Sequence, residues 1–371
     1  SGILYTLGQL SDEGHVYAGE EQLVKTAGQL LEAGETAIRD TLAGMLQAED
    51  LILDKDAIYL PPFYHAECGT SRRLRDLAES TGRSLFDGLF DPSSLTAETG
   101  IEYDEVQLAA IRQAVTFKVM VLTGGPGTGK TTTTQGIIAA LKKAGLRVLL
   151  AAPTGRAAKR MSEATGMEAK TIHRLLEVEW DKHDRPQFSR NARNPLDAQA
   201  VILDELSMVD ITLFSSFLEA LPIGCRLVMV GDSDQLPPVG AGNVLHDMIA
   251  SGIIPVVELT EVFRQAMESL IVENAHRIVK GEPPKLGVRD KDFFFMRTDS
   301  PFIAAKTVSD LCATRLPRAY GYSPLDDIQI ICPSRMGECG TNNINRVMQA
   351  SLNPPDASKP ETTVGATVFR T

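Results

Sequence analysis

The segment VMVLTGGPGTGKTTTT (residues 119–134) decides the fold class of this chain. An apolar run precedes a glycine-rich turn, and the turn fits the pattern G-x-x-x-x-G-K-[ST] from Gly124 to Thr131. An unbroken apolar run is typical of a parallel strand that is buried on both faces. We therefore predict a strand, a phosphate-binding loop and a helix, the context that this pattern requires.

Glycines let successive backbone N–H groups turn toward phosphate oxygens, and the N-terminus of the next helix favours anions. We expect the Lys130 ammonium to reach the β- and γ-phosphates of ATP and the Thr131 hydroxyl to bind Mg²⁺. The loop residues expected to bind ATP are Gly125, Pro126, Gly127, Thr128, Gly129, Lys130, Thr131 and Thr132.

The segment AVILDELSMVD (residues 200–210) is an apolar run that ends in two acids. A carboxylate at the end of a strand beside the phosphate loop is suited to Mg²⁺, which assigns Asp204 to the metal. Glu205 is then placed to orient or deprotonate the attacking water. Helix capping is the alternative role for one of the two acids.

The segment VGDSDQLPPVGAGN (residues 230–243) follows the next apolar run. The Gln235 amide both donates and accepts hydrogen bonds, so it is suited to sense a γ-phosphate and to bind backbone. Two prolines stiffen the loop, and Asn243 is a candidate for binding a sugar-phosphate strand. We predict a relay from nucleotide to a polymer; an ordinary Gly/Pro turn is the alternative.

The four apolar runs alternate with helical patterns, which predicts a doubly wound α/β domain with a parallel sheet. The expected strands are residues 118–124, 147–153, 200–205 and 226–232. The polar segment 176–195 interrupts this alternation and predicts an inserted hairpin that carries Trp180. A further apolar run, residues 327–335, predicts the first strand of a second α/β domain.

Residues 1–85 predict a small helical domain, with two amphipathic segments followed by a hairpin at 51–60. This order is similar to a winged helix, for which binding to DNA and packing against a neighbour are both open. Arg72, Arg73 and Arg75 are expected on a solvated helix face. A linker is expected over residues 86–100 because Gly, Pro, Ser and Thr are frequent there.

The composition, with 43% hydrophobic and 23% charged residues in 371, is that of a globular protein. No apolar run has the roughly 20 residues of a membrane span, and the first residues lack a signal-peptide pattern. Five scattered cysteines argue against disulfides and zinc, and favour a cytoplasmic protein. The net charge of −11 does not decide the partner, because a narrow basic path is sufficient to bind nucleic acid.

Six blocks in order resemble superfamily 1 DNA helicases, and the RecD family of the 5′-to-3′ branch most closely. They are GGPGTGKTTT, APTGRAAKRMSEATG, TIHRLL, LDELSMVD, GDSDQLPPVGAGNVLHD and LTEVFRQA, within residues 101–350. The resemblance implies a first RecA-like domain over 101–260 and the beginning of a second over 261–371. It further implies ATP and Mg²⁺ bound between them, and movement along single-stranded DNA, including the 5′ single-stranded tail of a duplex.

The same resemblance assigns individual residues. Gln107 corresponds to a glutamine that recognises adenine, with a plain polar helix position as the alternative. Arg264 corresponds to an arginine finger, with an ion pair to Glu261 or Glu268 as the alternative. The inserted hairpin corresponds to a strand-splitting pin. The residues expected to contact DNA are Pro153, Thr154, Arg156, His173, Arg174 and Asn243.

Some of these roles have a structural alternative: Arg156 fits a solvated face, and His173 fits a structural hydrogen bond. Arg335 is equally compatible with nucleotide, DNA or a helix cap. Two later motifs of the family's second motor domain are not found before Thr371, so a truncated second domain is expected. Two other functions stay open, a P-loop ATPase that remodels protein and an ATP-switched DNA-binding regulator without motor activity.

Overall fold

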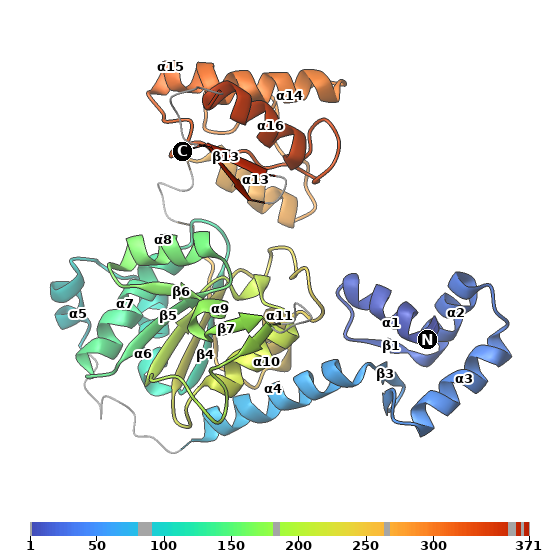
Figure 1. The fold of residues 1–371 in the computed structure, drawn as a ribbon. Helices are drawn as coiled ribbons and strands as arrows, with labels where there is room; N and C mark the ends of the chain where they lie inside the picture. Colours follow the sequence, from blue (N-terminus) through green and yellow to red (C-terminus); the bar gives the residue numbers. More distant parts are fainter. Residues whose placement is uncertain are drawn as a thin grey trace. The chain divides into compact units, whose positions relative to one another are not determined.

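A computed structural model describes residues 2–80, 91–180, 186–262, 268–354, 361–364 and 367–370. The chain forms two compact units, Ser1–Lys285 and Leu286–Thr371 (Figure 1). The first unit holds the large sheet and the N-terminal domain.

The centre of the first unit is a six-stranded sheet in the order β11-β4-β10-β9-β5-β6, in which all neighbouring strands are parallel. Its strands are β4 (Val119–Gly124), β5 (Val148–Ala152), β6 (Ala169–Thr171), β9 (Ala200–Leu203), β10 (Arg226–Gly231) and β11 (Val256–Leu259). The four predicted strands correspond to β4, β5, β9 and β10, which confirms the α/β class.

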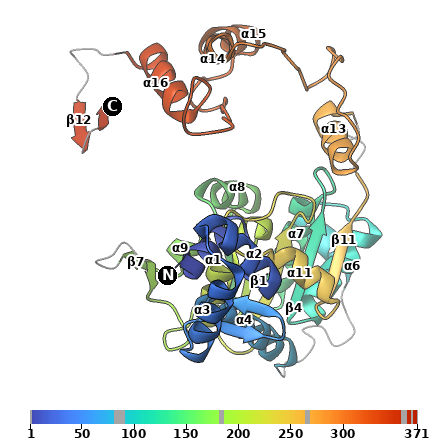
Figure 2. The ribbon, with the colours of Figure 1, turned by 90° about the vertical axis from the view of Figure 1, so that its right-hand side faces the viewer.

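Helices cover both faces of the sheet, and side chains of β4 alternate between the two layers. Met120 and Leu122 pack with α6 (Glu105–Thr116) and α7 (Lys130–Lys143). Val119 and Val121 pack with α10 (Ile211–Ala220), α11 (Val244–Ser251) and α4 (Pro61–Glu79). Figure 2 shows α6 beside β4 and β11. Burial on both faces explains why the strand sequences are continuously apolar.

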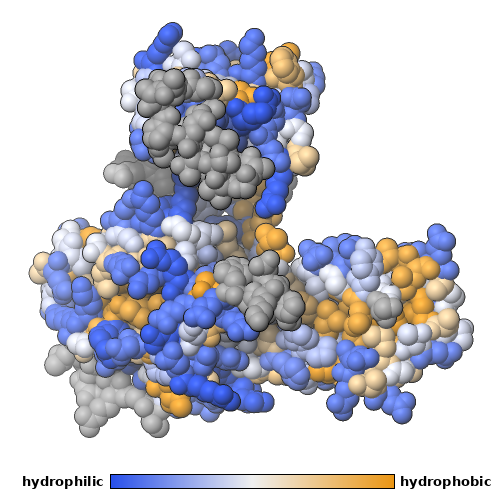
Figure 3. Space-filling view, in the orientation of Figure 1, coloured by the Kyte–Doolittle hydropathy of each residue, from blue (hydrophilic) through white to orange (hydrophobic). Residues whose placement is uncertain are grey.

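The N-terminal domain has the order of a winged helix, as predicted. Its elements are α1 (Gly2–Asp12), β1 (Tyr17–Gly19), α2 (Glu20–Leu31), α3 (Glu35–Gln47), β2 (Ile52–Asp54) and β3 (Ala57–Tyr59). The predicted hairpin is β2–β3, and β1 pairs with β3 to complete a three-stranded sheet. Leu23, Leu42 and Ile58 are buried in a separate core. Figure 3 shows hydrophobic residues on the surface of this domain, where Leu30 and Leu31 are partly exposed.

Helix α4 joins the N-terminal domain to the α/β domain by packing along α10. The Arg73 guanidinium donates to the carbonyl oxygen of Leu218 at 3.2 Å and to that of Leu221. The expectation of a solvated Arg73 is therefore wrong, because this side chain binds carbonyl groups at the C-terminal end of α10, whereas Arg72 and Arg75 are exposed. In the segment expected to be a linker, Asp91 caps a short helix, α5 (Pro92–Thr99).

The inserted hairpin is formed by β7 (Val178–Trp180) and β8 (Pro186–Phe188), with Val178 opposite Phe188, which confirms the predicted hairpin. Its tip lies outside the described residues.

The second unit holds α14 (Pro301–Asp310), a π-helical turn (Leu311–Arg315), α15 (Leu316–Tyr320), α16 (Thr341–Leu352) and the hairpin β12 (Glu361–Val364) and β13 (Thr367–Arg370). The strand expected at residues 327–335 is wrong, because the chain there is irregular and the Ile331 side chain is 86% exposed. A buried parallel strand needs neighbours on both sides, and no described strand of this unit pairs with the segment. Across the described residues, no helix has the length and apolarity needed to cross a membrane.

Candidate nucleotide site

A cavity of about 530 Å³ lies at the carboxyl edge of the parallel sheet, the usual position of ligands in this fold class. The phosphate loop forms one wall, and the ends of β9 and β10 form another. Its lining residues are Gly125 to Thr131, Thr134, Ala157, Arg160, Met161, Ala164, Thr165, Asp204, Glu205, Val230, Asp232 and Gln235. The cavity thus combines the phosphate loop with both predicted acids and the predicted sensor glutamine.

The phosphate loop adopts a backbone that only glycine allows at its first position. Gly124 has a φ of +154°, and a Cβ there would lie 2.6 Å from the carbonyl oxygen of Leu259 and 2.7 Å from Oγ1 of Thr128. Gly127 and Gly129 also have positive φ, at +77° and +86°. The Thr128 hydroxyl donates to the Gly125 carbonyl oxygen at 2.9 Å, which closes the loop on itself.

The Lys130 side chain folds back onto this loop. Its Nζ donates to the carbonyl oxygen of Gly125 at 2.9 Å and to that of Gly124, and lies 3.8 Å from Oδ2 of Asp232. Burial lowers the pKa of the ammonium, and the charge of Asp232 opposes this shift. The cation is therefore partly desolvated before any phosphate arrives, which strengthens its attraction to an anion.

The predicted acids follow β9 directly. Burial is the main cause that raises the pKa of Asp204 and of Glu205, and for Glu205 the charge of Asp204 adds to it. Glu205 has a φ of +54°, a conformation that a non-glycine residue rarely adopts and that is common at functional sites. Two desolvated carboxylates beside the Thr131 hydroxyl are hard oxygen donors, so the site fits a divalent cation such as Mg²⁺.

Gln235 lies between the acids and the loop that follows. Its Oε1 accepts from the Ser207 hydroxyl at 3.3 Å, and its Nε2 lies 3.5 Å from Oδ2 of Asp232. Further along the loop, the backbone N–H of Gly242 donates to the carbonyl oxygen of Gly14 at 3.0 Å. The loop therefore connects the nucleotide cavity to the N-terminal domain, a contact that the sequence did not indicate.

Helix α8 (Gly155–Thr165) contributes Arg160 to the nucleotide cavity, a residue that was not predicted to bind the nucleotide. Its N-cap is Thr154, whose Oγ1 accepts from the Ala157 N–H at 3.2 Å, and Arg156 is exposed. Arg160 lies one turn after Arg156 and lines the nucleotide cavity, where its charge acts on both acids. Helix α8 therefore presents Arg160, and not the predicted DNA contact Arg156, to the nucleotide cavity.

Comparison with known proteins agrees with this geometry. A family model described as an AAA domain matches residues 107–241. The ATP-dependent RecD2 DNA helicase of Deinococcus radiodurans is 33% identical over 93% of this chain and 47% of that protein. The RecBCD enzyme subunit RecD of Mycolicibacterium smegmatis is 34% identical over 67% of this chain and 50% of its own. The chain belongs to the RecD family of helicases.

The chain spans about half the length of the curated relatives it matches. A solved structure of the Pif1 helicase from Candida albicans has a TM-score of 0.41 at 20% identity, over 59% of this chain and 55% of that chain.

Two other residues predicted to bind the nucleotide, Gln107 and Thr132, do not line the cavity. Gln107 forms a capping box with Asp104 and is buried, and its Nε2 has no hydrogen-bond partner within the described part of the chain. Arg264 lies outside the described residues.

The residues expected to contact DNA lie at three places on the first unit. Pro153 and Thr154 follow β5 directly, and Thr154 caps α8. His173 and Arg174 lie on α9 (Ile172–Leu175), and the ring of His173 lies 5.9 Å from the ring of Phe188 at the base of the inserted hairpin. Asn243 precedes α11, and its side chain does not cap that helix.

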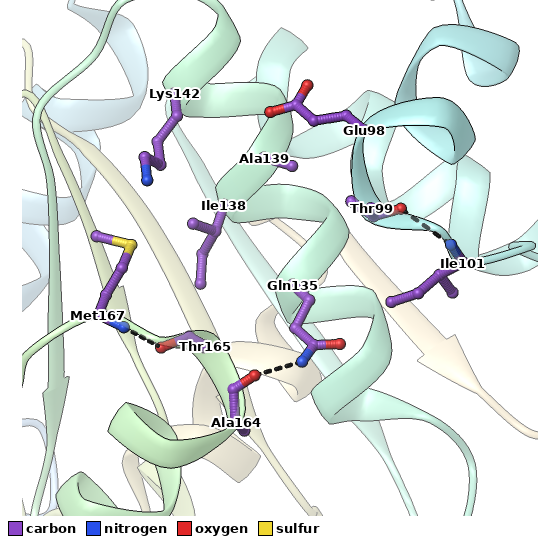
Figure 4. A pocket seen from close by; sticks show the side chains of 10 residues that line it. All are labelled: Glu98, Thr99, Ile101, Gln135, Ile138, Ala139, Lys142, Ala164, Thr165 and Met167. Atoms are coloured by element: carbon purple, nitrogen blue, oxygen red, sulfur yellow. Dashed lines mark hydrogen bonds between the residues drawn. The ribbon is translucent and has the colours of Figure 1, made fainter.

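A second cavity, of about 250 Å³, adjoins the first between α5, α7 and the end of α8 (Figure 4). The two cavities share Ala164 and Thr165. In Figure 4 the Gln135 amide donates to the Ala164 carbonyl oxygen, which fixes α8 against α7. Glu98 and Lys142 are the charged residues of its wall, and neither acid of the nucleotide site reaches it. The larger cavity is therefore the candidate active site.

Proposed function

We propose that this chain is the ATPase part of a helicase that moves 5′ to 3′ on single-stranded DNA and separates strands ahead of it. The observation that carries the proposal is the position of Gln235. Its side chain lines the nucleotide cavity, and the proline-containing loop that it begins leads to Asn243. A change at the nucleotide is passed along a stiff segment instead of being absorbed.

Each group of the cavity has a role in hydrolysis. Lys130 leaves the loop carbonyls to bind phosphate oxygens, and Glu205 orients and deprotonates the attacking water. Thr131 and Asp204 would hold Mg²⁺, which neutralises charge on the phosphates. The raised pKa of Glu205 suits a base, because a base is most effective when its pKa approaches the working pH.

We assign single-stranded DNA to Pro153, Thr154, Arg156, His173, Arg174 and Asn243, with a 5′ tail as the entry point on a duplex. Arg156 and Arg174 are exposed and available for phosphates. Residues 1–85 form an accessory domain, 101–260 the first motor domain and 261–371 the beginning of the second, which supplies Arg264. The five free cysteines and the nucleotide chemistry fit a cytoplasmic protein.

ATP hydrolysis measured with and without oligo-dT tests this proposal. We expect DNA to stimulate hydrolysis by the wild-type chain and Lys130→Ala to abolish hydrolysis. Gln235→Ala should still bind ATP but lose the stimulation, whereas Gln47→Ala, an exposed glutamine of the N-terminal domain, should behave as wild type. An ATP hydrolysis rate that is the same with and without oligo-dT would favour a protein-remodelling ATPase and would contradict the proposed helicase function.

Direction is tested separately on two partial duplexes. A duplex with a 5′ single-stranded tail should be unwound, and one with only a 3′ tail should not. Unwinding that requires the 3′ tail would reject the 5′-to-3′ assignment while leaving the ATPase assignment intact.

A further inference from the structure

His276 contacts the phosphate loop from outside the nucleotide cavity. It lies on α13 (Leu270–Val279), about 150 residues after the loop in sequence and within the same compact unit. A Cβ on Gly125 would lie 2.9 Å from Cε1 of His276, and the three nearest heavy atoms to it all belong to this ring. Gly125 lines the cavity and His276 does not, so the loop lies between the imidazole and the nucleotide.

The end of α13 is held by hydrogen bonds that fix the position of this ring. Asn274 is buried, its amide donates to the Lys285 carbonyl oxygen at 3.2 Å, and its Oδ1 accepts from the Lys285 N–H at 2.7 Å. Arg277 donates to the Pro283 carbonyl oxygen at 2.9 Å and pairs with Glu282. Because the residues on both sides of His276 are tied to the next segment, the ring has little freedom to move away from Gly125.

The Nε2 atom of His276 is buried, yet it has no hydrogen-bond partner among the residues that the structure describes. A buried polar atom without a partner is unfavourable, so its presence calls for an explanation. The nearby carbonyl group of Gly125 is already taken, because it accepts hydrogen bonds from Lys130 and from Thr128.

We propose that His276 is a positioning residue for nucleotide binding that acts through Gly125. When Lys130 turns from the loop carbonyls to a phosphate, Gly125 loses a donor at its carbonyl oxygen. The Nε2–H of His276 then donates to that oxygen, so the imidazole gains a partner and the oxygen, which still accepts from the Thr128 hydroxyl, regains a second donor. This inference rests on the proposed ATP site, and it gives α13 a direct response to the state of the phosphate loop.

Equilibrium binding of fluorescent mant-ATP to the 371-residue chain tests the proposal. His276→Phe keeps a planar ring but removes the donor, and we expect the Kd to rise about tenfold, the effect of losing one good hydrogen bond. His276→Gln carries an amide nitrogen near the position of Nε2, and its Kd should stay within about threefold of the wild-type value. His246→Phe is the matched control, since this histidine has a 65% exposed side chain on α11.

A wild-type Kd in His276→Phe, or a Kd in His276→Gln as weak as in His276→Phe, would overturn the role of the donor. A wild-type chain that does not bind mant-ATP would overturn the proposed function together with this inference, whereas the first two results leave the proposed function intact.

Thermal unfolding of Gly125→Ala tests the contact between Gly125 and the His276 ring in the absence of nucleotide. This experiment replaces the binding assay if His276→Phe does not fold. The added methyl group collides with the imidazole, so Gly125→Ala should lower the melting temperature in the wild-type background. In the His276→Ala background the same change should have a smaller effect. Additive effects of the two substitutions would show that the ring and the loop are not in contact, and would overturn the proposal.

Discussion

Replacing Gly242 with alanine tests whether the loop after Gln235 is locked against the rest of the first unit. Gly242 has a φ of +93°, and an added Cβ would lie 2.9 Å from Cβ of Ile211 and 3.3 Å from Cγ1 of Val16. Ile211 is buried at the start of α10, and Val16 belongs to the N-terminal domain. A methyl group therefore has to displace either the helix or the domain that the loop contacts.

Two terms set the expected destabilisation. A side chain in left-handed backbone is unfavourable by roughly 1–2 kcal/mol. Overpacking at a buried contact adds about 1–3 kcal/mol, so the free energy of unfolding should fall by about 2–5 kcal/mol in total. Gly252 provides the matched control, because its φ is +64° and nothing lies within 4 Å of an added Cβ. Gly252→Ala should lower the free energy of unfolding only by the backbone strain, roughly 1–2 kcal/mol.

The melting temperatures of the two variants separate these terms. At about 2–4 °C per kcal/mol for a domain of this size, Gly242→Ala should melt at least about 2 °C below Gly252→Ala. Hydrolysis assays on the same samples should show that Gly242→Ala loses stimulation by oligo-dT more than Gly252→Ala does. Equal melting temperatures for the two variants would refute the inferred contact between this loop, α10 and the N-terminal domain.

Three further substitutions test other contacts. Burial raises the pKa of Asp204, so its contribution to stability is greatest below the ordinary carboxyl pKa and is lost as the pH rises through the raised value. Without metal and nucleotide, Asp204→Asn should therefore melt above wild type at neutral pH, and the gain should disappear toward about pH 4 in thermal scans. Arg160→Ala should raise the Kd for mant-ATP about tenfold, while Lys159→Ala, an exposed neighbour, should leave it unchanged. Arg73→Ala should lower the free energy of unfolding in urea by about 1–3 kcal/mol, and Arg72→Ala, which is exposed, by much less.

The nucleotide cavity could be predicted from sequence because each of its main parts is a short contiguous pattern at the end of a strand. Parallel strands bring their carboxyl ends to one edge of a sheet, so the residues after β4, β9 and β10 had to meet there. Lys130, Asp204 and Gln235 follow from this rule without any knowledge of side-chain packing. The hairpin at 176–195 was also predictable, since it interrupts a regular alternation.

The contacts that were missed join residues far apart in the chain, or depend on which side of a helix faces inward. Arg156 and Arg160 lie one turn apart and are both exposed, yet only Arg160 lines the cavity, and the sequence of α8 does not specify which of the two does. Arg73 looked like one of three equivalent surface charges until α4 packed on α10. The apolar run at 327–335 was wrongly predicted to be a strand, because an apolar pattern indicates burial but does not show whether a neighbouring strand is present to pair with it.

The loop from Asp232 to Asn243 has a third contact besides the nucleotide and DNA contacts predicted from the sequence, namely a hydrogen bond to the N-terminal domain. Gln235 lines the nucleotide cavity, Asn243 is the residue proposed to contact DNA, and the backbone N–H of Gly242 between them donates to the Gly14 carbonyl oxygen. A stiff segment transmits a displacement only if some point of it is held, because a free segment would move as a whole. The hydrogen bond from Gly242 to Gly14 supplies this fixed point, so movement at Gln235 should turn the loop about Gly242. On this argument the N-terminal domain serves the motor as a support, and its removal should reduce DNA stimulation of hydrolysis while leaving the nucleotide cavity intact.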